Sequence, residues 1–208
     1  MKDRLRRAGA RFLVFLLLAA GSLGETSSAH VLPGQKGRPQ SWREEKGIAA
    51  PDFRLTDQDG RRVSLSDLRG KVVLVTFIYT SCADLCPLIT AKVAVLERRF
   101  RDRGRIHFVS VTTDPEVDTP AALRAYGKRF GADFSRWSFL TGTEGAVKEV
   151  WKAYGVNVIR LGRGNVEHNY LTALIDASGV WRAAYHGESW ETADVGEEID
   201  RLAGTPRR

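Results

Sequence analysis

Two cysteines are the residues best suited to carry chemistry, and they are the only cysteines of the 208-residue chain. Cys82 and Cys86 follow an apolar run over residues 71–79 and lie at the start of a helical pattern over residues 87–100. A helix N-terminus stabilises negative charge, so a thiol there has a lowered pKa and a larger thiolate fraction. Because the thiolate both binds soft metal ions and attacks disulfides, the pair is predicted to be a metal site or a redox centre.

The four-residue spacing of the cysteines favours metal ligation over a permanent disulfide. Residues i and i+4 of a helix lie on one face with their Cβ atoms about 5–6 Å apart, whereas a disulfide needs a Cβ separation of about 3.8 Å. A stabilising disulfide, common in exported proteins, is the alternative interpretation. Such a bridge would contribute little stability, because the entropic gain of a cross-link grows with the length of the loop that it closes.

The elements that must position this pair alternate between strands and helices. Residues 71–79 are nearly continuous in β-branched and aromatic side chains, which suits a strand covered on both faces. The predicted strands and helices are a hairpin (53–55 with 63–65), the strand 71–79, a helix (87–100), a strand (106–111), a helix (118–130), a strand (137–140), a helix (144–154), a hairpin (171–176 with 180–185) and a helix (191–202). This order predicts an α/β fold, a thioredoxin-like three-layer sandwich with a mixed sheet and an N-terminal hairpin.

A histidine occupies the position at which thioredoxin-like reductases usually carry a cis-proline facing the cysteines. No proline occurs between Pro120 and Pro206, and His168 lies just before the strand predicted over residues 171–176. An imidazole is a good copper ligand, and two thiolates with one imidazole suit Cu(I) and can also accept Cu(II). The two cysteines and this histidine are therefore the predicted metal ligands.

Other ionisable residues have structural interpretations. His107 lies inside a predicted strand, and His186 lies near the end of the last predicted hairpin. The neighbours of Asp114 and Asp118 are typical of turns and helix caps rather than of acid-base catalysis. Asp84, between the cysteines, is expected to stabilise the helix N-terminus rather than to bind metal.

The first 29 residues have the layout of an export signal. A basic run precedes an apolar stretch over residues 12–20, and small residues follow. This stretch is shorter than the about 20 apolar residues that a membrane-spanning helix needs, so a cleaved signal is favoured over an uncleaved anchor. We expect a signal at 1–29, a linker or ordered arm at 30–50 and the copper-binding domain at 51–204, in a periplasmic protein that is soluble or tethered to the inner membrane.

The charge distribution argues against a nucleic-acid partner. Residues 1–29 hold five basic and two acidic residues, so their removal would lower the formal net charge from +7 to +4. The remaining charges are mixed in sign, as in Glu97-Arg98-Arg99, which is typical of a solvated helix face. We expect a monomer that contacts a membrane only through an uncleaved N-terminal segment.

Four motifs occur in a fixed order along residues 50–203. They are Tyr79-Thr80-Ser81-Cys82-Ala83-Asp84-Leu85-Cys86-Pro87, Val109-Ser110-Val111-Thr112-Thr113-Asp114-Pro115 continuing to Asp118-Thr119-Pro120, Phe139-Leu140-Thr141-Gly142, and His168 ahead of Leu174-Ile175-Asp176. In order and spacing they resemble the SCO/SenC copper proteins, which assist assembly of the copper centre of cytochrome c oxidase. The resemblance implies copper bound by Cys82, Cys86 and His168.

Two classes of function are considered. The first is implied by the resemblance: a metallochaperone or assembly factor that delivers copper to, or reduces the ligand thiols of, the copper centre of an exported respiratory oxidase subunit. We expect its partners to be that subunit and another copper chaperone. The second is a thiol-disulfide oxidoreductase in which Cys82 attacks a substrate disulfide and Cys86 resolves it. A peroxidase of the peroxiredoxin type is disfavoured, because no proline lies between Pro51 and Pro87. Dependence of copper affinity on His168 would separate the first class from the second.

Overall fold

A computed structural model describes residues 42–204 of the chain. The predicted export signal at 1–29 and the first part of the segment 30–50 lie outside the described residues. Of the helices in the described part, none is long and apolar enough to cross a bilayer.

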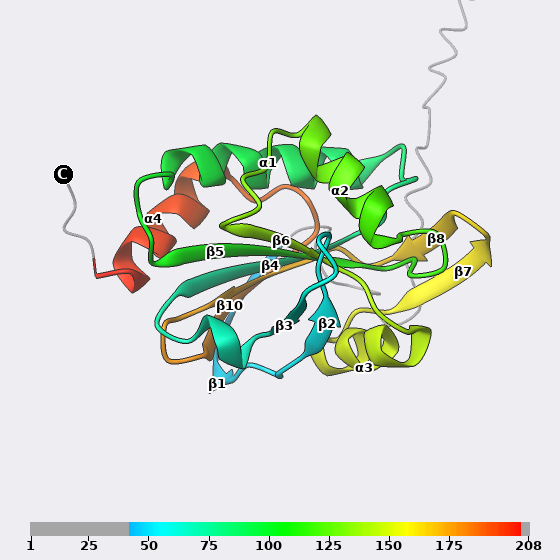
Figure 1. Cartoon of the computed structure of the whole chain (residues 1–208). Coiled ribbons are helices and arrows are strands. Elements are labelled where there is room, and N and C mark those ends of the chain that lie inside the picture. Colours follow the sequence, from blue (N-terminus) through cyan, green and yellow to red (C-terminus); the bar gives the residue numbers. More distant parts are fainter. Residues whose placement is uncertain (1–41, 205–208) are drawn as a thin grey trace, which may run out of the picture. The chain divides into compact units, whose positions relative to one another are not determined.

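A six-stranded mixed sheet forms the centre of the domain, in the strand order β1-β10-β9-β4-β5-β6 (Figure 1). Its strands are β1 (Trp42–Ala49), β4 (Val72–Ile78), β5 (Ile106–Thr112), β6 (Trp137–Leu140), β9 (Leu171–Ile175) and β10 (Val180–His186). β4, β5 and β6 run parallel, whereas β9, β10 and β1 each pair antiparallel with their neighbours. The carboxyl ends of the parallel strands therefore meet at one edge of the sheet, where α/β proteins place their ligands.

Helices cover both faces of this sheet (Figure 1). One face carries α1 (Leu85–Arg99), α2 (Pro120–Arg129) and α4 (Thr192–Leu202); the other carries α3 (Glu144–Tyr154), the 3-10 turn η1 (Ser66–Leu68) and the hairpin β2 (Arg54–Thr56) with β3 (Arg62–Ser64). A separate two-stranded sheet, β7 (Val158–Gly162) with β8 (Asn165–His168), projects from the domain. The architecture is the thioredoxin-like three-layer sandwich with an N-terminal hairpin that the sequence predicts.

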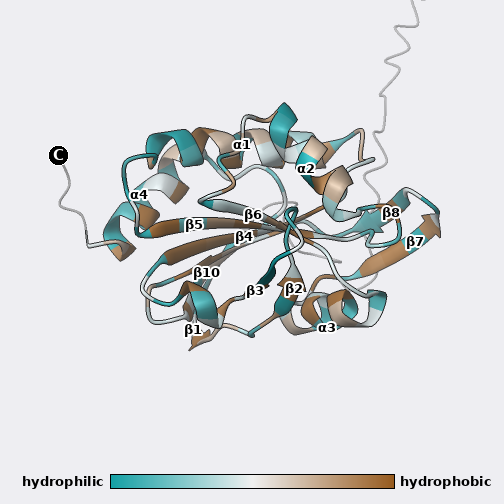
Figure 2. Cartoon of the chain, in the orientation of Figure 1, coloured by the Kyte–Doolittle hydropathy of each residue, from teal (hydrophilic) through white to brown (hydrophobic). Residues whose placement is uncertain are grey.

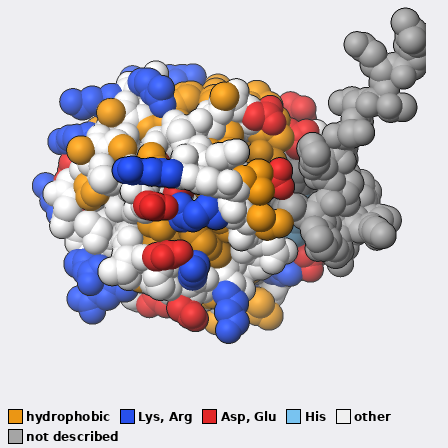
Figure 3. Space-filling model, turned by 90° about the vertical axis from the view of Figure 1, so that its right-hand side faces the viewer, with side chains coloured by type: hydrophobic (Ala, Val, Ile, Leu, Met, Phe, Trp, Pro, Cys, Tyr) orange, Lys and Arg blue, Asp and Glu red, His pale blue; other side chains and the backbone are white. Residues whose placement is uncertain are grey.

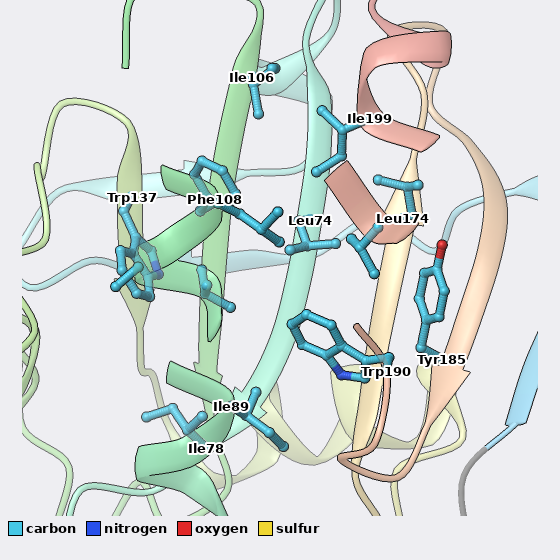
Figure 4. Close-up of a cluster of buried hydrophobic side chains, with 14 of the residues drawn as sticks. Leu74, Ile78, Ile89, Ile106, Phe108, Trp137, Leu174, Tyr185, Trp190 and Ile199 are labelled. Carbon is cyan, nitrogen blue, oxygen red and sulfur yellow. The ribbon is translucent and has the colours of Figure 1, made fainter. Parts of the chain in front are cut away.

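The side chains of β4 alternate between two hydrophobic cores. Leu74 and Ile78 pack beneath α1, α2 and α4, together with Phe108 and Trp137 (Figure 4). Val73, Val75 and Phe77, the intervening residues, pack against α3 and the β2–β3 hairpin. Figure 2 shows the resulting pattern, in which apolar strands lie between helices with polar outer faces. Every residue of β4 is buried, which confirms the prediction of a strand covered on both faces.

The edge strand β1 occupies residues 42–49, inside the segment interpreted from the sequence as a linker or ordered arm. It pairs antiparallel with β10, with a register shift between Glu45 and Ile48. An ion pair at 2.5 Å between Arg43 and Glu198 connects β1 to α4. The sequence of β1 has no alternation of apolar and polar residues, so its pairing depends on contacts with distant parts of the chain.

The close packing of α2 gives the first testable prediction, on two helical glycines. A Cβ atom at Gly127 would lie 2.8 Å from ring carbons of Phe134 and Phe139, so Gly127→Ala overpacks the core and is expected to cost about 1–3 kcal/mol of unfolding free energy. Gly145, in α3, has nothing within 4 Å of the same atom. Gly145→Ala is the control and is expected to be neutral or to stabilise by up to about 1 kcal/mol. Urea denaturation measures both, and equal effects at the two positions would contradict the packing argument.

Candidate thiol and histidine site

The cysteines lie at the carboxyl end of β4, but only one of them is in a helix. β4 ends at Ile78 and α1 begins at Leu85, so Cys82 lies in the connecting loop and Cys86 in the first helical turn. The prediction that both sulfurs share one helix face is therefore wrong. Asp84 is the N-cap residue of α1, and its side chain makes no capping bond. Cys82, in the loop before it, interacts with the Cys86 thiol.

The two cysteines, both free and buried, differ in the acidity of their thiols. The side chain of Cys86 hydrogen-bonds Cys82, and the backbone N–H groups of Asp84 and Cys86 also stabilise the Cys82 thiolate. These donors lower the pKa of Cys82, whereas the same thiol-thiol bond, followed by burial, raises the pKa of Cys86. The first deprotonation of the pair therefore places the negative charge on Cys82.

His168, the last residue of β8, faces the cysteine pair. Its Nε2 lies 3.8 Å from Cys86 Sγ, and its Nδ1 lies 3.1 Å from the backbone carbonyl oxygen of Asn169. Because only a protonated Nδ1 can donate to that carbonyl, the neutral ring presents the lone pair of Nε2 toward the sulfur. Burial lowers the pKa of His168 to about 4, so the ring is neutral at physiological pH. A neutral imidazole with one nitrogen fixed in this way is the form that binds metal ions.

Neighbouring groups hold the imidazole in this orientation. The ring of Tyr79 meets it edge-on with centroids 6.0 Å apart, and the ring of Tyr170 lies 4.9 Å away. The side chain of Asn169 accepts a bond from the backbone N–H of Asn157 at 2.6 Å and donates to the carbonyl of Gly155 at 3.2 Å. The segment that follows His168 is therefore hydrogen-bonded to the residues directly after α3.

Asp118 supports the cysteine loop, a role that the sequence analysis missed. Its fully buried carboxylate accepts bonds from the backbone N–H and the hydroxyl of Thr80 and from the hydroxyl of Thr112. The predicted capping role is wrong for this side chain, because the hydroxyl of Thr119 caps α2 at the backbone N–H of Ala122. Burial raises the pKa of Asp118 while these bonds oppose the rise. The only signal in the sequence was its place in one of the four motifs.

The donor set suits a soft metal ion, although the three side chains do not yet converge. Within residues 42–204, no group of three or more Cys, His, Asp or Glu residues is close enough to hold a metal as it stands. Cys86 contacts both Cys82 and His168, so it is the shared member of two pairs. Two thiols and one imidazole match the ligand preferences of Cu(I). The other two imidazoles of residues 42–204 have different partners: His107 of β5 bonds Ser138 of β6, and His186 faces Glu44 on β1.

Together the fold and the site define a thioredoxin-like domain with a free thiol pair beside a neutral histidine. The chain belongs to the SCO1/SenC family, whose model matches residues 42–204. A SCO1 protein homolog of Bacillus subtilis is 36% identical over 91 residues, which are 43% of this chain and 47% of that relative. This match thus spans less than half of the relative's length.

Solved structures of the same family share the fold. The structure of BsSco, described as a member of the Sco family of cytochrome c oxidase assembly proteins with a disulfide switch, is 26% identical with a TM-score of 0.67. That comparison covers 78% of this chain and 98% of BsSco. ScoI of Bradyrhizobium japonicum, solved with copper bound, is 26% identical with a TM-score of 0.62 over 74% of this chain and 99% of that protein.

Proposed function

We propose that this protein is an exported copper-binding assembly factor for a respiratory oxidase, with Cys82, Cys86 and His168 as the copper ligands. The contact of 3.8 Å between Cys86 Sγ and His168 Nε2, beside the Cys82 thiol, is the observation that carries the proposal. Copper would be delivered to the copper centre of an exported oxidase subunit, or the thiols of that centre would be reduced. Copper when bound is the cargo, and the chain's own residues select and orient it.

Three features of the residues support copper. The thiolate of Cys82 and the free Nε2 of His168 are available without the loss of a proton at neutral pH, so only Cys86 must be deprotonated. Thiolate and imidazole ligands select Cu(I) over the harder divalent ions. A structural relative also binds copper, since ScoI of Bradyrhizobium japonicum was solved with copper bound.

The setting of this function is also proposed. Residues 1–29 are assigned to an export signal, with the domain in the periplasm, either soluble or tethered to the inner membrane. We expect the partners to be a copper-accepting oxidase subunit and a second copper chaperone, and the protein to act as a monomer. Hydrophobic side chains lie among acidic and basic ones on the end of the domain that carries the β7–β8 hairpin (Figure 3), a mixture typical of transient interfaces.

A thiol-disulfide oxidoreductase is the second candidate, and one observation favours it. The lowered pKa of Cys82, with Cys86 in contact, is the arrangement of an attacking and a resolving thiol. BsSco, a structural relative, is described as containing a disulfide switch. The same sulfur atoms serve both functions, so the metal must be measured directly.

The test of the proposal is the Cu(I) stoichiometry of the reduced protein under anaerobic conditions. We expect one Cu(I) per chain, and loss of this binding in Cys82→Ser and Cys86→Ser because a hydroxyl is a poor ligand for a soft ion. Ala83→Ser is the matched control, since it introduces a hydroxyl between the cysteines without removing a ligand. Reduction of insulin disulfides by each variant is followed in parallel. Wild-type protein that binds no Cu(I) but reduces insulin would favour the oxidoreductase.

A further inference from the structure

The β7–β8 hairpin carries His168 but is not part of the central sheet. Within residues 42–204 its two strands pair only with each other, with Val158 opposite His168 at the base of the hairpin. No ladder of backbone hydrogen bonds therefore fixes the hairpin against β4 and the cysteine loop. Its position depends on side-chain contacts with neighbouring elements, and one buried carboxylate makes two of them.

Asp114 uses both of its carboxylate oxygens to hold this hairpin. It follows the end of β5 and is completely buried. One oxygen forms an ion pair with Arg160 of β7 at 2.7 Å, and the other accepts the backbone N–H of Gly164, in the turn between β7 and β8, at 3.1 Å. A buried carboxylate is costly unless it is paired, and breaking such a pair leaves an uncompensated charge. The compensation of Asp114 therefore depends on the hairpin lying in this position.

The same turn is bonded to the cysteine loop. The hydroxyl of Ser81, which directly precedes Cys82, donates to the carbonyl of Gly164 at 3.0 Å. The peptide groups of Gly164 are thus held by Asp114 on one side and by Ser81 on the other. This arrangement links the loop that carries Cys82 to the hairpin that carries His168.

We propose that Asp114 is a positioning residue for the site, because it fixes the β7–β8 hairpin so that His168 Nε2 stays within reach of the thiol pair. The inference deepens the proposed copper function and rests on it for its metal-binding readout. Asp114 is not a ligand: it acts through Arg160 and Gly164. Outer groups that orient a metal ligand typically change affinity by about 10–100-fold when they are removed.

Arg160 provides a matched control, because a second carboxylate pairs with it. Glu116 lies 2.6 Å from the same guanidinium, but its side chain is 55% exposed. An exposed ion pair contributes little, since water and salt screen it. Glu116→Gln and Asp114→Asn therefore each remove one carboxylate that pairs with Arg160. Only Asp114→Asn removes a buried carboxylate, whose ion pair is shielded from water.

The experiment uses the full chain with three variants. For Asp114→Asn we expect a Cu(I) affinity about 10–100-fold below wild type, measured by competition with a chromogenic chelator, and Glu116→Gln should stay within about twofold. Arg160→Gln removes one of the two attachments and is expected to give a smaller loss, so it tests the idea even if Asp114→Asn does not fold. Urea denaturation checks that each variant is folded.

A metal-free readout separates this inference from the copper function. In the reduced apoprotein, Asp114→Asn is expected to speed hydrogen exchange at the Gly164 amide and to shift the imidazole resonances of His168 in NMR spectra, whereas Glu116→Gln changes neither. If wild type binds no copper but these signals change as expected, the copper function fails and the positioning role stands. Wild-type affinity and unchanged His168 signals in folded Asp114→Asn and Arg160→Gln proteins would overturn the inference.

Discussion

Replacing His168 with alanine is expected to lower the Cu(I) affinity by at least about 100-fold while thiol-disulfide exchange continues. Loss of an outer group costs about 10–100-fold in metal sites, so loss of a ligand should reach or exceed the upper end of that range. Exchange requires only the two sulfurs. The pKa of Cys82 is lowered by Cys86 and by backbone N–H groups, so the attacking thiolate persists without the imidazole.

This experiment compares His168→Ala with His186→Ala. His186 lies at the end of β10 with its Nε2 3.3 Å from a carboxylate oxygen of Glu44, and it is not one of the proposed ligands, so its replacement should leave the Cu(I) affinity unchanged. Chelator competition gives the affinity, and the rate of reaction with an aromatic disulfide gives the exchange activity. An unchanged affinity in His168→Ala would remove the histidine from the ligand set. Parallel loss of affinity and exchange would indicate that the substitution disrupts the fold around the cysteines.

The second large effect is expected in the reactivity of the two thiols. The hydrogen bond from Cys86, together with backbone N–H groups, lowers the pKa of Cys82 to about 6, whereas the pKa of Cys86 is raised. An ordinary thiol, with a pKa of about 8.5, is only about 3% thiolate at pH 7. Cys82 should keep most of its thiolate at pH 7 and lose it only as the pH falls through its own lowered pKa. Cys86 should stay protonated and unreactive throughout.

Mass spectrometry of brief iodoacetamide labelling measures this difference from pH 5 to pH 9. Cys86→Ala removes the donor and should move the Cys82 profile toward higher pH, while Cys86→Ser retains a donor and should move it less. Equal labelling of both cysteines at pH 7 would show that their pKa values do not differ as expected. A Cys82 profile that Cys86→Ala leaves unchanged would show that Cys86 is not the cause of the lowered pKa of Cys82.

Elements with a strong local pattern could be predicted closely. β6 (Trp137–Leu140) and α3 (Glu144–Tyr154) begin and end at the predicted residues, because a buried apolar run and a capped helical period are properties of neighbouring residues. β1 and the β7–β8 hairpin could not be predicted in this way. Most of β7 is exposed, and β1 is held by contacts such as Arg43 with Glu198, 155 positions later in the chain.

The same distinction separates the predicted and the missed parts of the site. The position of Cys86 opposite His168 follows from motif order and from the place of each residue beside a strand. The bonds of Asp118 to Thr80 and of Asp114 to Arg160 and Gly164 connect residues 38–50 positions apart and involve turns that no periodic pattern marks. The loop conformation of Cys82 was missed for a related reason: sequence spacing cannot tell whether a helix begins before or after a residue near its N-terminus.

The position of β9 between β4 and β10 determines when, during synthesis and folding, the proposed metal site can form. Cys86 and His168 are 82 positions apart, and the segment that follows His168 must insert beside β4 before the imidazole can approach the sulfur. Such non-local pairing forms late, because the entropy of closing a long loop must be overcome first. A chain emerging from a ribosome thus lacks the complete proposed ligand set until His168 and the β9 segment that follows it have been released. Metal loading is consequently a step that follows folding.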